Sequence, residues 1–175
     1  PPDANHSDFM FVATDARTVR YGLGAVKGVG QGACEAIVAA RQAGGAFADL
    51  LDFCKRVDSG KLNKRALEAL VHAGALDALG RNRASLMQQL PEVLKAIDQI
   101  NRNRNAGIVD MFGNAASGSD IEVRLPQVEA EWPLAQKLQG ERDTLGFYLS
   151  GHPMDEYAED LRGLLGNDLG GLDRL

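Results

Sequence analysis

The sequence predicts a mainly α-helical protein with a small β-hairpin near its N-terminal end. Apolar residues recur at intervals of three and four, the spacing of one helix face, from Ala33 to Ile100 and again beyond Leu134. Short alternating runs lie at 9–12 and 19–21. The 175 residues are 45% hydrophobic and 25% charged, which suits one substantial core or two small ones.

Residues 1–22 are expected to form the β-hairpin, because the two alternating runs flank the polar stretch from Thr14 to Arg17. The hairpin leads into residues 27–33, which read Lys-Gly-Val-Gly-Gln-Gly-Ala and begin a helical pattern that stops at Gly44 and Gly45. These residues predict two short helices joined by a glycine hairpin.

Such a hairpin is suited to holding an anion. Gly28 and Gly30 would allow the backbone to turn through positive φ and to approach a ligand closely, and the next helix would offer unpaired N–H groups. The alternative is a tight turn between helices without a ligand. If nucleic acid is the ligand, the residues that we expect to contact its backbone are Lys27, Gly28, Val29, Gly30, Gln31 and Gly32.

A nucleotide cofactor is not expected at this hairpin. It lacks the Gly-Lys-Ser/Thr ending of a triphosphate-binding loop and the spacing of the dinucleotide fingerprint, and no βαβ pattern surrounds it.

Two further helices complete a predicted tandem helix-hairpin-helix module over residues 23–100. The first has the apolar stripe Phe47, Leu50, Leu51 and Cys54, and the second has Leu67, Leu70 and Val71, with Asn63 as N-cap and Gly74 at its end. A second helix-turn-helix, 62–90, thus repeats the first in outline. Its turn at 73–75 holds one glycine and is expected to serve packing.

A longer apolar pattern from Leu86 to Ile100 predicts a helix that kinks or restarts near 88–90, because Pro91 lies inside it. Residues 101–127 are polar and glycine-rich, which predicts a flexible loop. One apolar island within it favours a docking peptide for a partner's pocket, the alternative being a loop that packs on its own domain. The island comprises Ile108, Val109, Asp110, Met111 and Phe112.

Residues 128–175 are expected to form a C-terminal helical segment. One helix begins at Trp132 and Pro133 and ends at Gly151. A second, short helix begins at Pro153, and its predicted buried side comprises Tyr157, Leu161, Leu164 and Leu165.

The net charge of −5 is unevenly distributed along the chain. Residues 17–104 hold 14 Lys and Arg against 8 Asp and Glu, whereas residues 105–175 hold 5 against 13. A polyanion would be attracted to the basic middle section, although a solvated helix face also explains a modest excess.

The residue pattern indicates binding rather than catalysis. Cys34 and Cys54 are expected to be reduced core residues, and His6, His72 and His152 stand alone without metal-ligand spacing. No Ser/His/Asp set or paired carboxylates are evident, so we expect no catalytic residue, metal or cofactor. No membrane-spanning run or signal peptide is expected, and the start at Pro1 suggests an excised fragment of a cytoplasmic protein.

Six motifs, in order along almost the whole chain, resemble the alpha subunit of bacterial DNA polymerase III. The resemblance covers one region of that large protein, after the fingers, and leaves the aspartates of the polymerase palm outside. The motifs are Pro-Pro-Asp-Ala-Asn at 1–5, Tyr-Gly-Leu-Gly-Ala-Val-Lys-Gly-Val-Gly at 21–30, Asp-Phe-Cys-Lys-Arg-Val at 52–57, Leu-Asn-Lys-Arg-Ala-Leu-Glu-Ala-Leu at 62–70, Asp-Met-Phe-Gly at 110–113 and Leu-Gly-Phe-Tyr-Leu-Ser-Gly-His-Pro at 145–153.

The resemblance implies two contacts in a bacterial, cytoplasmic replication protein. Residues 27–32 would touch the backbone of duplex DNA, and residues 108–112 would dock on the ring-shaped sliding clamp. Ile108 stands where the family's clamp peptide usually has Gln, which implies weaker docking. The other implied partners are the remaining domains of the polymerase and further holoenzyme subunits. The alternatives are a purely structural segment of the polymerase and the same region of the error-prone paralogue.

Overall fold

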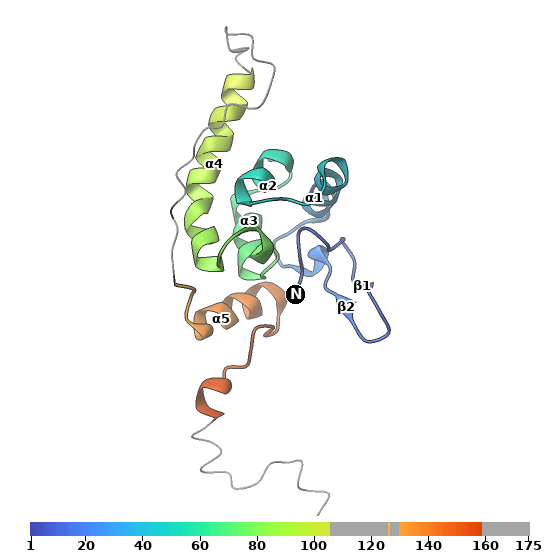
Figure 1. Cartoon of the computed structure of the whole chain (residues 1–175), viewed down its shortest axis with the longest axis vertical. Helices are drawn as coiled ribbons and strands as arrows, with labels where there is room; N and C mark the ends of the chain where they lie inside the picture. Colours follow the sequence, from blue (N-terminus) through green and yellow to red (C-terminus); the bar gives the residue numbers. More distant parts are fainter. Residues whose placement is uncertain (106–125, 127–129, 159–175) are drawn as a thin grey trace, which may run out of the picture.

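The structure, a computed structural model, describes residues 1–105, 126 and 130–158. It confirms a mainly helical fold with a two-stranded antiparallel hairpin (Figure 1). Helix α4 packs on α2 and α3, and α5 also packs on α3 and lies below it in Figure 1. The helices are α1 (Gln31–Gly44), α2 (Leu50–Arg56), α3 (Lys64–His72), α4 (Arg83–Asn105) and α5 (Leu134–Leu145).

The hairpin is shorter than the sequence predicts. Strands β1 (Val12–Ala13) and β2 (Val19–Arg20) pair with Val12 opposite Arg20. The residues before β1 pair elsewhere, since the carbonyl of Phe9 accepts the Gly24 N–H at 3.0 Å. They thereby fix the next element, the single 3₁₀ turn η1 (Leu23–Ala25), which replaces the first of the two predicted helices.

The predicted caps lie where the helices begin and end. Asn63 Oδ1 accepts the Ala66 N–H at 2.9 Å at the start of α3. At the end of α1, Gly45 adopts a φ of 77°, which favours glycine. A second 3₁₀ turn, η2 (Asp77–Leu79), joins α3 to α4.

Helix α4 continues through Pro91, so a restart near 88–90 is wrong, whereas a kink there, the other predicted outcome, stays a prediction. Proline removes one backbone hydrogen bond, but the buried face of α4 is held against α2 and α3 on both sides of it. The helix also continues through Asn105, into the segment predicted as a loop. The buried residues of this face are Leu86, Leu90, Val93 and Ile97.

The core is continuous through α1, α2, α3 and α4. It includes Cys34 and Cys54, which are free and buried as predicted. Burial raises the pKa of the Cys54 thiol to about 12, so this thiol stays protonated at neutral pH.

The C-terminal helix α5 ends at Leu145, earlier than predicted, because Gly146 takes a left-handed φ of 89°. A single 3₁₀ turn, η3 (Asp155–Tyr157), follows. Tyr157 is 54% exposed, so its predicted burial is wrong. Leu161, Leu164 and Leu165 lie outside the described residues.

Candidate nucleic-acid interface

The predicted glycine hairpin joins η1 to the N-terminal end of α1 and lies at the surface. Val29 is the exception, with only 6% of its surface exposed, so its side chain holds the hairpin to the core. The exposed members are Lys27, Gly28, Gly30, Gln31 and Gly32.

The backbone conformation requires glycine at one position of the hairpin but not at another. Gly28 has a φ of 87°, which disfavours any residue with a Cβ. Gly30 has a φ of −77° and a ψ of 162°, an extended conformation open to most residues. The predicted positive φ at Gly30 is therefore wrong.

Gly30 and Gly32 also face open space. A Cβ on Gly30 would have no atom within 4 Å, and a Cβ on Gly32 would meet only Lys61 Cδ, at 4.0 Å. Neither the backbone conformation at Gly30 nor packing at either position requires glycine. Their small size leaves room for an external group to approach the backbone closely.

The N-terminal end of α1 is uncapped by side chains. Its N-cap, Gly30, has no side chain, and the first turn contains no acidic residue. Gln31 Nε2 donates along the helix to Glu35 Oε1 at 2.8 Å and so leaves the end open. The Ala33 N–H donates to the Gly30 carbonyl at 3.0 Å, whereas the N–H groups of Gln31 and Gly32 come too early in α1 to have an intrahelical partner, and they carry the positive end of the helix dipole. This end favours an anion.

Three basic residues lie just before and at the start of α3, one of them beside the hairpin, and the sequence pattern did not predict them as site residues. Lys61 packs beside Gly32, and Lys64 and Arg65 begin the helix. All three are exposed; Lys64 lies 3.7 Å from Glu68, whereas Lys61 and Arg65 have no ion-pair partner among the described side chains. Cations at a helix N-terminus interact unfavourably with the helix dipole. Basic residues at this unfavourable position were the feature of the sequence that could have indicated a binding role.

The second predicted hairpin, at 73–75, is buried. Ala73 and Ala75 are 0% and 1% exposed. A Cβ on Gly74 would lie 2.1 Å from an Arg83 guanidinium nitrogen. This turn serves packing, as predicted.

Helix α5 holds the first hairpin in place, since the Lys27 N–H donates to the Thr144 carbonyl at 2.8 Å. It is itself fixed by a buried ion pair, with Arg83 Nη1 2.9 Å from Glu141 Oε1. Arg83 is 3% exposed and Glu141 0%. Arg83 also forms a two-pronged pair with Asp77, at 2.8 and 2.9 Å.

Glu141 is the most highly hydrogen-bonded carboxylate of this region. Besides Arg83, it accepts the N–H groups of Leu149 at 2.6 Å and Ser150 at 2.9 Å, and the Ser150 hydroxyl. Burial alone would raise the pKa of Glu141, but these donors lower it below its ordinary value. Glu141 is therefore ionised at neutral pH.

A second carboxylate, Glu131, links the residues before α5 to α4. It accepts the N–H groups of Arg83 and Ala84 at 3.2 and 3.1 Å, at the start of α4. The adjacent Trp132 ring stacks on His72, with centroids 4.9 Å apart. These contacts are structural and involve no reactive group.

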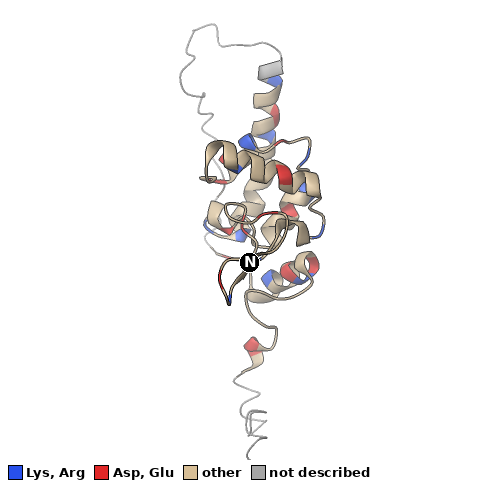
Figure 2. Cartoon of the chain, turned by 90° about the vertical axis from the view of Figure 1, so that its right-hand side faces the viewer, with Lys and Arg blue, Asp and Glu red and all other residues tan. Residues whose placement is uncertain are grey.

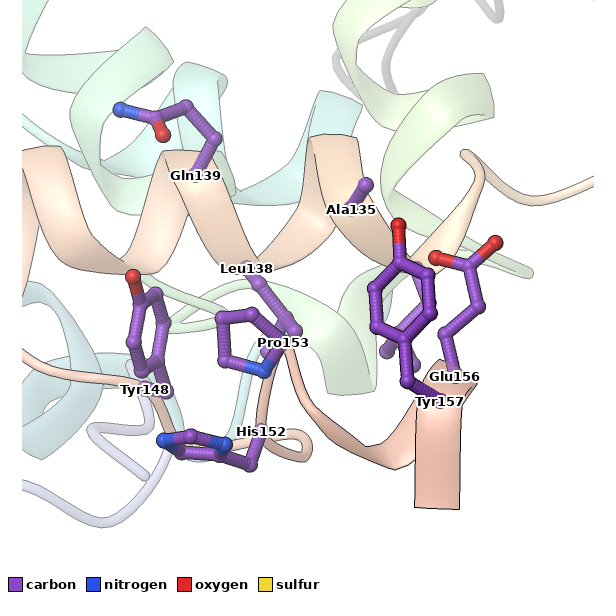
Figure 3. Close-up of a pocket in the computed structure, with 9 residues that line it drawn as sticks. Ala135, Leu138, Gln139, Tyr148, His152, Pro153, Glu156 and Tyr157 are labelled. Carbon is purple, nitrogen blue, oxygen red and sulfur yellow. The ribbon is translucent and has the colours of Figure 1, made fainter. Parts of the chain in front are cut away.

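A cavity of about 280 Å³ lies between α5 and η3 (Figure 3). Tyr148 and Tyr157 flank Pro153 and Leu138 there. His152 lies in the loop before the 3₁₀ turn, and its backbone N–H donates to Asp155 Oδ2 at 2.6 Å. Within the described ranges, no cluster of His, Cys, Asp or Glu could hold a metal ion.

Lys and Arg are interspersed with Asp and Glu over the helices rather than gathered into one large basic face (Figure 2). The case for an anion site therefore depends on the hairpin and the start of α3. No helix among the described residues has the length and apolar character to span a membrane. The predicted clamp peptide, Ile108 to Phe112, lies outside the described residues.

Residues 1–86 match the family described as the helix-hairpin-helix motif. The chain is also similar along nearly its whole length to DNA polymerase III subunit alpha of several bacteria. Identity is 58% with the Xylella fastidiosa protein (strain Temecula1) over 96% of this chain, 46% with that of Vibrio cholerae over 92%, and 44% with that of Escherichia coli K12 over 95%.

Each of these alignments covers 14% of the relative, so the chain spans a small part of those proteins' length. The matched part contains the glycine hairpin at the start of α1 and the basic start of α3. The chain belongs to the DNA polymerase III alpha subunit family, as a region that carries a helix-hairpin-helix motif.

Proposed function

We propose that this chain is the part of a bacterial, cytoplasmic replicative DNA polymerase that grips the backbone of duplex DNA. The observation that carries the proposal is the open N-terminal end of α1, where Gly30 and Gly32 are required by neither fold nor packing. Lys61, beside Gly32, adds a cation to the same site. Nucleotide transfer would belong to other regions of the polymerase.

The test is a titration of fluorescently labelled duplex at several salt concentrations. Each neutralised phosphate contributes about −0.9 to the slope of log affinity against log salt. We expect weak, sequence-independent binding, and Lys27→Ala and Lys61→Ala should each make the slope shallower by about 0.9.

Lys95→Ala is the matched control, because Lys95 is an exposed lysine on α4 paired with Glu92 at 2.8 Å. It should leave the slope unchanged. Salt-independent binding, or an equal effect of all three lysine substitutions, would contradict the assignment and favour a hairpin that serves packing alone.

We also infer a second contact, between residues 108–112 and the sliding clamp. The support is the sequence Ile-Val-Asp-Met-Phe, whose Met111 and Phe112 are suitable anchors for an apolar pocket. The position of Ile108 matches that of a Gln in the family's peptide, so the amide hydrogen bonds would be absent here.

Removal of both anchors, by Met111→Ala with Phe112→Ala, should abolish clamp binding and leave the melting temperature nearly unchanged. Buried anchors commonly contribute about 2 kcal/mol or more each to a small interface. Ile108→Gln should strengthen binding. Surface plasmon resonance with immobilised clamp and a thermal melt measure the two effects.

The chain offers a matched control in Met10→Ala with Phe11→Ala, which removes the same two side-chain types from an exposed site. If the 111/112 variant melts early and still binds the clamp, these residues belong to the core and the docking assignment is wrong.

A further inference from the structure

We propose that the exposed apolar surface of the β-hairpin binds an apolar face of another domain of the same polymerase polypeptide. This surface, here called the hairpin face, comprises Met10, Phe11, Val12 and Val19. The proposal depends on membership of the family and is independent of DNA binding. Because the chain spans 14% of its relatives' length, most of such a polymerase lies outside it.

The side chains of the hairpin face are apolar and yet largely exposed to solvent. Met10 is 66% exposed, Val19 65%, Phe11 50% and Val12 40%. Val12 lies opposite Arg20 and Ala13 opposite Val19, and consecutive side chains of a strand point to opposite faces, so Val12 and Val19 make the hairpin apolar on both sides. Exposed apolar side chains gathered on one hairpin in this way mark a site of interaction.

The root of the hairpin is held firmly. The Leu23 N–H donates to the Asp8 carbonyl at 2.8 Å, and Gly24 donates in the same way to Phe9. A Cβ on Gly22 would lie 2.5 Å from the Phe9 carbonyl oxygen, so the two backbone segments are in close contact. The hairpin is therefore presented in a fixed orientation, which lowers the entropic cost of binding.

An aromatic row extends the hairpin face toward the segment after α5. Phe11 packs edge-on against Tyr21, with centroids 4.5 Å apart, and Tyr21 lies 5.4 Å from Phe147. Phe147 is itself 39% exposed. Figure 1 shows the hairpin projecting away from the helices. One surface is thus built from both ends of the described chain.

The shape of this surface favours another domain over a second copy of the chain. A symmetric dimer requires a patch that is complementary to itself, and a projecting hairpin paired with its copy would leave its outer side bare. A groove on another domain can cover both sides. Interfaces between domains of one chain commonly bury about 600–1,500 Å².

The first experiment compares the oxidation of Met10 by hydrogen peroxide in the isolated chain and in the complete polymerase, with mass spectrometry as the readout. Peroxide transfers one oxygen to the thioether sulfur and leaves water, so the rate reports access to the side chain. We expect at least tenfold slower oxidation in the complete polymerase, kept at concentrations where sedimentation shows a monomer. Equal rates, or protection of the isolated chain that appears only as its concentration rises, would overturn the proposal.

The second experiment places a charge on the face with Val19→Lys. In the complete polymerase it should restore Met10 oxidation to the rate of the isolated chain. In the isolated chain it should leave both the melting temperature and duplex binding unchanged, which separates this proposal from the DNA contact. Ala16→Lys adds the same charge at the exposed hairpin turn and should change nothing. Persistent protection in the Val19→Lys polymerase would count against the hairpin face.

Discussion

Replacing Arg83 with methionine is expected to lower the free energy of unfolding by about 3–5 kcal/mol, because it leaves Glu141 buried and ionised without its cation. Glu141 is fully buried and 2.9 Å from Arg83 Nη1. For a chain of this size the loss corresponds to a fall in melting temperature of roughly 6–20 °C. Urea denaturation and a thermal melt at pH 7 measure it.

Arg142→Met is the matched control, since Arg142 lies next to Glu141 in sequence but is exposed and donates only to Tyr148 among the described hydrogen bonds. Its effect should stay within about 0.5 kcal/mol. A loss below about 1 kcal/mol for Arg83→Met would show that the pair contributes little.

The effect of Arg83→Met should depend on pH in a defined direction. The folded-state pKa of Glu141 lies below its ordinary value of 4.5. The stabilisation is therefore complete above that value and is lost as pH falls through the folded-state pKa. The difference between wild type and variant should be largest at neutral pH and should shrink in acid.

A double substitution at the N-terminal end of α1, Gly30→Asn with Gly32→Glu, is expected to reduce duplex affinity more than tenfold without loss of stability. Asn is a favoured N-cap and Glu suits the first turn of a helix, so the fold should be unharmed or stabilised. The same side chains would occupy the space and the N–H groups that a phosphate needs, and Glu would repel it.

Ala39→Glu is the matched control for charge, because Ala39 is exposed on the same helix, away from its N-terminal end. Fluorescence anisotropy gives the affinity and a thermal melt gives the stability. Gly28 is unsuitable for this test, since its φ of 87° would strain any replacement. Wild-type affinity in the double variant would show that DNA does not approach this end of α1.

The caps and the apolar stripes made much of the fold predictable. Asn63 and Gly45 fix helix ends through local hydrogen bonds and backbone conformation, which act over a few residues. The helical conformation around Pro91 and the exposure of the Tyr157 side chain depend instead on tertiary packing, which the local sequence does not reveal. The buried face of α4 tolerates the proline, and the exposure of Tyr157 has no local cause that its sequence neighbourhood reveals.

Only the part of the candidate site that depends on local sequence could be predicted. The run of glycines at 28, 30 and 32 is visible in the sequence, but the conformation that distinguishes Gly28 from Gly30 depends on how α1 begins. Lys61 joins the site only through the packing of the α2–α3 loop beside Gly32. No spacing rule relates these two positions.

The hydrogen bond from Lys27 to Thr144 joins groups more than one hundred residues apart in the chain. Closing so long a loop carries a large entropic cost, and contacts of this separation form late in folding. During synthesis, the glycine hairpin would leave the ribosome before α5 and would lack this support until α5 had been made and had docked. A truncated version that stops after α4 would keep every residue of the hairpin and lose the hydrogen bond that fixes it.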